Sequence, residues 1–148
     1  MTSNILVVED SETRNEIFRR ILGDSNSVHI ATTAQRAIDL IECNWPYDEI
    51  YLDHDLEPSH YGYALFGTRG MTEQQIQADM RIISNLSGTG KDVAKWIVAT
   101  EKDCRNTKIV IHSLNSVGAR QIWDIFRDVR IAAQVCPFPL LVQNWRVV

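Results

Sequence analysis

The feature that most constrains the fold is a continuous apolar run, Ile5 to Val8, that ends directly in two acids, Glu9 and Asp10. Such a run is typical of a strand that is buried on both faces of a parallel sheet. Helical spacing of apolar residues follows over 12–22, then a short strand at 28–31, a second helix at 34–43 and a strand at 50–52. This alternation predicts an α/β fold with right-handed crossovers and helices on both faces of the sheet.

The alternation stops at residues 57–87 and then resumes. We expect a helix from about 88 to 100, a strand at 108–112, a helix at about 117–130 and a fifth strand at 132–135. The tail at 138–148 leaves a short helix and an edge strand as alternatives. A long segment that directly follows an acidic strand end is more often a lid or binding loop than filler. We therefore predict one domain over residues 1–148, a doubly wound five-stranded parallel sheet with a lid-like insertion at about 57–87, which includes a helix at about 72–83.

Composition excludes some classes of function. The 148 residues carry a net charge of -4, which disfavours a protein that binds duplex nucleic acid through clustered Lys and Arg. No apolar run approaches the roughly 20 residues of a membrane span, so we expect a cytoplasmic protein without a membrane partner. The three cysteines lack CxxC spacing and are interpreted as reduced thiols. A small phosphorylated ligand or cyclic nucleotide remains compatible with this charge, and the oligomeric state is left open.

Polar residues gather where the predicted strands end. Parallel sheets bind ligands at the carboxyl ends of their strands. Carboxylates that share such an edge repel one another unless a divalent cation neutralises them. We therefore predict a metal site that holds Mg²⁺ or Mn²⁺, with Zn²⁺ as a further candidate because imidazole lies near. The predicted metal ligands are Glu9, Asp10, Asp53 and Asp55.

Two histidines follow neighbouring strands, and two such residues can act as acid and base on one phosphodiester. His54 has an alternative as a partly buried imidazole that bonds loop backbone. The alignment of the fourth strand is ambiguous by one residue, so that either His112 or Ser113 faces the edge. We predict Asp53, His54 and His112 as catalytic residues.

Four further residues are candidates for binding the substrate. Ser113 follows the fourth strand, and Asn115 either presents its amide to an oxyanion or caps the next helix. Lys91 opens a helix in Gly88-Thr-Gly-Lys91, which is not a P-loop because Asp92 stands where Ser or Thr is needed. In the insertion, Arg69 can pair with phosphate, and the aromatic residues near it either stack on a base or anchor the loop.

Residues 4–58 resemble a response-regulator receiver domain of flavodoxin-like topology. In that resemblance Glu9 and Asp10 match the acidic metal-binding pair and Asp53 matches the phosphoacceptor, which implies magnesium held by Asp10, Asp53 and a backbone carbonyl two residues later. Ser113 is similar to the Ser/Thr that ends strand 4. The Lys-Pro pair that follows strand 5 in receivers is replaced by Cys136-Pro137.

Three further segments resemble a receiver offshoot, the cyclic-phosphate processing receiver domain. The resemblance implies a phosphoric ester hydrolase that acts on a cyclic phosphate or cyclic nucleotide with a divalent metal. Two alternatives stay open: a divergent or pseudo-receiver signalling module phosphorylated on Asp53, and a protein that binds a cyclic nucleotide without cleaving it. The three segments are Leu52-Asp-His-Asp-Leu56, Ile111-His-Ser-Leu-Asn115 and Gly118-Ala119.

Overall fold

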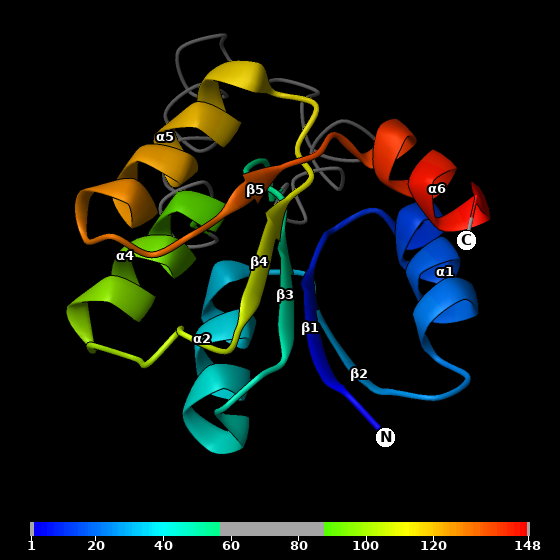
Figure 1. Ribbon diagram of the computed structural model, residues 1–148, viewed down its shortest axis with the longest axis horizontal. Coiled ribbons are helices and arrows are strands. Elements are labelled where there is room, and N and C mark those ends of the chain that lie inside the picture. Colours follow the sequence, from blue (N-terminus) through cyan, green and yellow to red (C-terminus); the bar gives the residue numbers. More distant parts are fainter. Residues whose placement is uncertain (1, 57–87, 148) are drawn as a thin grey trace, which may run out of the picture.

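The computed structural model describes residues 2–56 and 88–147 (Figure 1). Five parallel strands form one sheet in the order β2-β1-β3-β4-β5. The predicted five-stranded parallel sheet is therefore confirmed, and the proposed insertion at 57–87 lies outside the described residues. The strands are β1 (Asn4–Val8), β2 (Ser27–Ala31), β3 (Glu49–Leu52), β4 (Lys108–Ile111) and β5 (Gln134–Val135).

Helices cover both faces of the sheet. In Figure 1, α1 (Glu12–Leu22) lies beside α6 (Phe138–Val147) on one face. The other face carries α2 (Ala34–Asn44), α4 (Gly90–Ala99) and α5 (Ser116–Asp128). The sequence left a short helix and an edge strand open for the tail, and the structure has the helix. The predicted helix at 72–83 falls outside the described residues.

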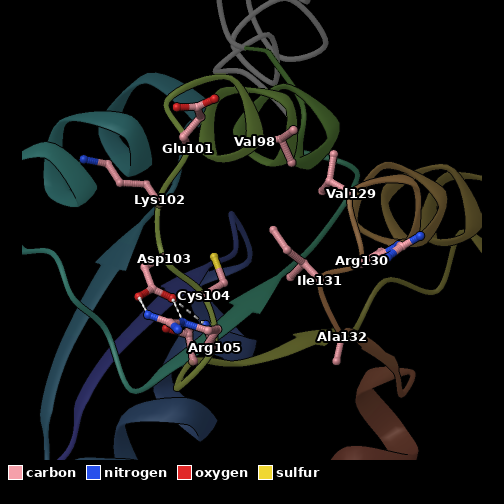
Figure 2. A pocket seen from close by; sticks show the side chains of 11 residues that line it. Val98, Glu101, Lys102, Asp103, Cys104, Arg105, Val129, Arg130, Ile131 and Ala132 are labelled. Carbon is pink, nitrogen blue, oxygen red and sulfur yellow. Dashed lines mark hydrogen bonds and ion pairs between the residues drawn. The ribbon is translucent and has the colours of Figure 1, made fainter.

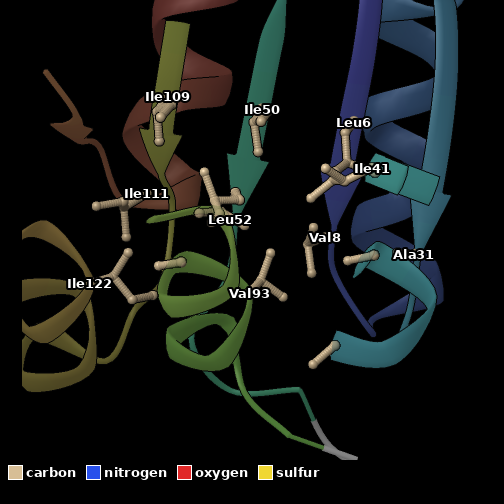
Figure 3. Packing of buried hydrophobic residues seen from close by; sticks show 14 of the residues in the cluster. Leu6, Val8, Ala31, Ile41, Ile50, Leu52, Val93, Ile109, Ile111 and Ile122 are labelled. Carbon is tan, nitrogen blue, oxygen red and sulfur yellow. The ribbon is translucent and has the colours of Figure 1, made fainter. Parts of the chain in front are cut away.

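The alternation of side chains along β1 explains this layering. Leu6 and Val8 pack into the core beneath α2, α4 and α5, together with Ile50 and Leu52 of β3 (Figure 3). Ile5 and Val7 face the opposite side, where the second core cluster contains residues of α1 and α6. A strand whose successive side chains enter two cores must be apolar throughout, which accounts for the unbroken run in the sequence.

Polar caps start the helices just after the strand ends. The Ser11 hydroxyl accepts from Arg14 N at 3.3 Å and begins α1, and Thr33 Oγ1 accepts from Arg36 N and begins α2. Asn115 Oδ1 accepts from Gly118 N at 3.0 Å and begins α5. Such caps satisfy backbone donors that the first helical turn leaves unpaired. They fix the helix starts at the carboxyl edge of the sheet, beside the predicted site.

No helix within residues 2–56 and 88–147 combines the length and apolarity that a membrane crossing requires.

Candidate active site at the carboxyl edge of the sheet

Glu9 is the centre of a buried ion network. The residue follows β1 and has no solvent-exposed surface. Its Oε2 accepts from the backbone N–H groups of Asp10 and Ser11 at 2.9 and 3.1 Å, while its Oε1 lies 3.1 Å from Arg14 Nη1. Burial favours the neutral carboxyl, but the hydrogen bond with His112 and those with Asp10 and Ser11 outweigh it and lower the Glu9 pKa to about 2. Glu9 is therefore an ionised carboxylate throughout the physiological pH range.

Asp53 follows β3 and lies beside this carboxylate. It is 3% exposed, and its Oδ2 lies 3.8 Å from Arg14 Nη1. Burial, and then the repulsion of Glu9, raise the Asp53 pKa to about 7, although Ser113 and Arg14 oppose the change. The two carboxylates repel each other, so Glu9 ionises at low pH and the ionisation of Asp53 is shifted to higher pH.

His112 lies behind the two acids. Its ring is fully buried, its Nε2 is 3.3 Å from Glu9 Oε1, and its edge contacts Phe18 with ring centroids 5.2 Å apart. Burial lowers the His112 pKa, although hydrogen bonding and charge attraction from Glu9 oppose the change. Among the described residues, His112 Nδ1 is one of two buried side-chain polar atoms without a hydrogen-bond partner. The strand-end ambiguity is thus resolved: Ser113 lines the surface cavity and His112 points inward.

The donor set fits a divalent cation. Glu9, Asp53 and His112 each offer one ligand atom, and these atoms all lie within 4.8 Å of one another. Two carboxylates and an imidazole are ligand types that bind divalent metals. The structure thus brings together two of the four predicted metal ligands, joined by a histidine that was predicted for catalysis. The other two, Asp10 and Asp55, lie on the adjoining cavity wall.

A cavity of about 430 Å³ opens over these residues. Its volume is within the range of small-molecule sites. Mostly polar and charged side chains from the ends of three strands, β1, β3 and β4, and from the first turn of α1 line it, which suits a charged ligand better than an apolar one. The lining consists of Asp10, Ser11, Glu12, Arg14, Asp53, Asp55, Ser113 and Leu114.

His54 forms a second, separate group with Asp55. Its Nδ1 lies 2.8 Å from Asp55 Oδ1, and Asn115 Nδ2 donates to the same oxygen at 3.2 Å. The ring packs against the start of α5, where a Cβ built on Gly118 would stand 2.4 Å from His54 Cγ. Glycine at 118 is therefore required for the ring to occupy this position. His54 and His112 are not paired: one borders the cavity through Asp55, and the other is buried behind Glu9.

The remaining predicted residues differ in their placement. Ser113 lines the cavity, and its Oγ accepts from Asn115 N at 3.1 Å. Asn115 caps α5 and bonds Asp55, so that both ends of its amide are engaged. Lys91 is half-buried in the first turn of α4 and does not line this cavity. Arg69 lies outside the described residues.

Arg14 is the site residue that the sequence reasoning missed. It comes one turn into α1, four residues after Asp10, and its guanidinium reaches both Glu9 and Asp53. Phe138 at the start of α6 lies under the guanidinium, with 5.8 Å from Cζ to the ring centroid. The sequence did contain a signal for Arg14. It is a basic residue in the first helical turn after an acidic strand end, on the side of the helix that faces the sheet.

A larger cavity, of about 640 Å³, lies away from the acids, where α4 and α5 end (Figure 2). Val98, Val129, Ile131 and Cys104 form its apolar part. Burial raises the Cys104 pKa, as does the neighbouring Asp103, which favours the protonated thiol over the nucleophilic thiolate. Asp103 is paired with Arg105 at 2.8 Å on the rim. None of the strand-end acids lines this cavity.

Comparison with known proteins decides the family. Residues 5–128 match the family described as Cyclic-phosphate processing Receiver domain. The chain belongs to this receiver family. A search of functionally curated proteins found no significant match.

Solved receiver structures share the fold of this family member. The receiver domain of HemR from Leptospira biflexa is 23% identical, with a TM-score of 0.61 over 99% of this chain and 90% of that one. A CheY-like receiver domain from Methylobacillus flagellatus is 14% identical, with a TM-score of 0.58 over 99% and 98%. The beryllofluoride-activated DrrB receiver domain is 12% identical, with a TM-score of 0.56 over 99% and 96%. At these identities the likeness establishes the fold alone.

Receiver domains bind Mg²⁺ through acidic residues, and this receiver carries an acidic cluster with Glu9 and Asp53.

Proposed function

We propose that this receiver-family domain is a metal-dependent phosphoesterase that acts on a cyclic phosphate or a cyclic nucleotide. The observation that carries the proposal is the group of Glu9, Asp53 and His112, whose ligand atoms lie within 4.8 Å of one another beside a polar cavity. The family description names the same class of substrate. Buried like charges in contact with a ligand-sized cavity are a frequent property of catalytic sites.

Asp53 and Glu9 would hold the cation, with Asp10 on the cavity wall and His112 behind. A bound divalent cation polarises a phosphoryl oxygen and neutralises charge that develops on it. Mg²⁺ prefers oxygen ligands, whereas the imidazole in this set favours Mn²⁺ or Zn²⁺. Titration of the purified protein with each ion separates these candidates.

The pairing with Asp55 suits His54 to proton transfer. The Asp55 carboxylate favours the tautomer with the proton on Nδ1, which leaves Nε2 as an acceptor. Asn115 holds Asp55 from its other side and thereby fixes the pair at the start of α5. In this proposal His54 takes a proton from water or returns one to the departing oxygen.

His112 has a different part. Its ring has no exposed surface, so it orients Glu9 rather than contacting a substrate. Ser113 lines the cavity and can donate its hydroxyl to a phosphoryl oxygen. Lys91 and Arg69 remain predicted ligand-binding residues, and Asn115 is proposed to position Asp55.

The direct test is hydrolysis of 2',3'-cyclic nucleotides in the presence of Mg²⁺ or Mn²⁺. We expect His54→Gln to lower kcat by about 10²- to 10⁴-fold, the usual contribution of one general acid or base, with unchanged metal affinity. His29→Gln is the matched control, because His29 bonds Tyr47 away from the cavity. Full turnover by the His54 variant would remove this residue from the reaction. Absence of turnover by the wild-type protein on every cyclic phosphate tried would overturn the hydrolase proposal.

A second candidate function is a receiver that is phosphorylated on Asp53. The position of Asp53 at the end of β3, beside Ser113, favours it, and one similar receiver structure is a beryllofluoride-activated form. The site departs from that pattern at Cys136, which is buried and lies 3.9 Å from Asn144 Nδ2. A thiol cannot provide the charge-assisted bond that an ammonium gives a phosphoryl oxygen.

Two experiments separate the candidates. Acetyl phosphate or beryllofluoride should modify or bind at Asp53 if the domain is a working receiver, and Asp53→Asn should abolish the response. Incubation with a cyclic nucleotide followed by denaturation distinguishes cleavage from sequestration: linear product indicates an enzyme, and intact ligand indicates a binding protein.

A further inference from the structure

Arg14 is a cationic side chain that contacts both buried acids, Glu9 and Asp53. Its Nη1 lies 3.1 Å from Glu9 Oε1 and 3.8 Å from Asp53 Oδ2. Within residues 2–56 and 88–147, no other Lys or Arg forms an ion pair with either acid. Arg14 thus offsets part of the repulsion between two buried carboxylates.

The two contacts of Arg14 differ in kind. The contact with Glu9 is a hydrogen bond between charged groups, whereas 3.8 Å to Asp53 is beyond hydrogen-bond distance. A guanidinium has five N–H donors, of which the Glu9 bond uses one. The side chain is 31% exposed and lines the polar cavity. Arg14 can therefore lose its contact with Asp53, retain its hydrogen bond with Glu9 and still donate hydrogen bonds to a ligand.

The surroundings hold Arg14 at this place. The Phe138 ring lies 5.8 Å from its Cζ, and the N–H of Phe138 donates to the His112 carbonyl at 3.0 Å, which fixes the start of α6 beside β4. At the end of β5, where a receiver has lysine, Cys136 is apolar in character and buried. Among the residues that the structure describes, the positive charge that pairs with the acids therefore comes from Arg14 on α1.

We propose that Arg14 is a resident counter-cation of Asp53 that a divalent metal displaces, and that the displaced guanidinium pairs with the phosphoryl oxygens of the ligand. The inference rests on the proposed function, because it assigns the cation and the phosphate to that same site. A metal ion at Asp53 repels the guanidinium, so metal binding weakens the Arg14–Asp53 contact, which at 3.8 Å is already longer than a hydrogen bond. The planar guanidinium then meets phosphate in the paired geometry that it favours.

The test measures binding of Mn²⁺ alone, and of inorganic phosphate at saturating Mn²⁺, by isothermal titration calorimetry. Arg14→Gln should bind Mn²⁺ about tenfold more tightly, since no resident cation must leave, and phosphate about tenfold more weakly, since one charged hydrogen-bond donor is lost. Arg20→Gln is the matched control, because it removes the same charge from an exposed position on the same helix. Both affinities of this control should equal those of the wild type.

A second variant distinguishes a specific effect of Arg14→Gln from a general loss of folding. Arg14→Lys keeps the charge but loses the planar fork, so it should retain wild-type Mn²⁺ affinity and bind phosphate more weakly. Unchanged or weaker Mn²⁺ binding by Arg14→Gln would overturn the inference, as would a Lys variant that binds phosphate as well as the wild type. These readouts do not involve turnover. Failure of the cyclic-phosphate assay with the predicted affinity changes intact would reject the hydrolase and leave the role of Arg14 standing.

Discussion

Replacement of Gly118 by alanine tests whether this glycine makes room for His54. The ideal Cβ would lie 2.4, 2.6 and 2.7 Å from His54 Cγ, Nδ1 and Cδ2. These distances are far below van der Waals contact, so that the ring must leave its place at the start of α5. The substitution therefore separates a packing requirement from the usual helix preference of alanine.

The expected magnitude follows from opposing effects. Glycine to alanine inside a helix ordinarily stabilises by about 1 kcal/mol. Against this, overpacking costs about 1–3 kcal/mol, and loss of the His54–Asp55 hydrogen bond costs about 1 kcal/mol more. We expect a net decrease of about 2 kcal/mol in the free energy of unfolding, with a shift of the His54 imidazole NMR resonances.

Urea denaturation provides the free energy of unfolding, and the imidazole resonances report the position of His54. Val117→Ala is the matched control: the residue is 68% exposed on the same helix, and we expect a change within about 0.5 kcal/mol. A gain of about 1 kcal/mol for Gly118→Ala with unshifted His54 resonances would refute the argument, because the ring would then tolerate the added methyl group.

Three further variants test the acids and their backbone. Without metal, Asp53 has a folded pKa of about 7 against an ordinary 3.8, so the folded state binds its proton more tightly and stability falls as the pH rises from about 4 to about 7. Asp53→Asn should escape this loss and, in urea titrations at pH 8, be more stable than the wild type by up to about 4 kcal/mol; equal stability across the window would contradict the raised pKa. Glu9→Gln should lower the free energy of unfolding by about 2 kcal/mol at neutral pH, because Arg14 loses its charged acceptor, and an unchanged denaturation midpoint would contradict this expectation. Gly90→Ala should destabilise by about 3 kcal/mol or prevent folding, because its Cβ would stand 1.8 Å from the Asp53 backbone oxygen, which cannot rotate away; a stable, soluble variant would count against this packing.

The sheet and most helices were predictable because their signals are local. The apolar run from Ile5 to Val8 predicted a strand covered on both faces of the sheet. The acid that follows β3, Asp53, predicted the edge of the sheet that carries the site. Helix boundaries were within two residues for α5, which the sequence placed at 117–130 and the structure at Ser116–Asp128. Capping by Asn115 explains the earlier start.

The arrangement inside the site was harder to predict. The alternation of side chains breaks down at a strand end, so sequence reasoning could not decide between His112 and Ser113 for the cavity wall. Arg14 was missed because a lone basic residue on a helix is usually solvent-exposed, and only the tertiary packing of α1 on the sheet turns it toward the acids. Lys91, predicted to bind the substrate, lies in the first turn of α4 but is not among the residues that line this cavity.

The C-terminal helix has a practical consequence for trimming this domain. The family match ends at residue 128, yet Phe138 supports Arg14, and Trp145 packs on Phe18 and Tyr51. A protein shortened to the matched segment would lose β5 and α6, expose the part of one sheet face that α6 covers, and remove the Phe138 ring beside the guanidinium. Any attempt to graft the acidic centre onto another receiver must therefore carry its aromatic C-terminal helix along with the strand-end residues.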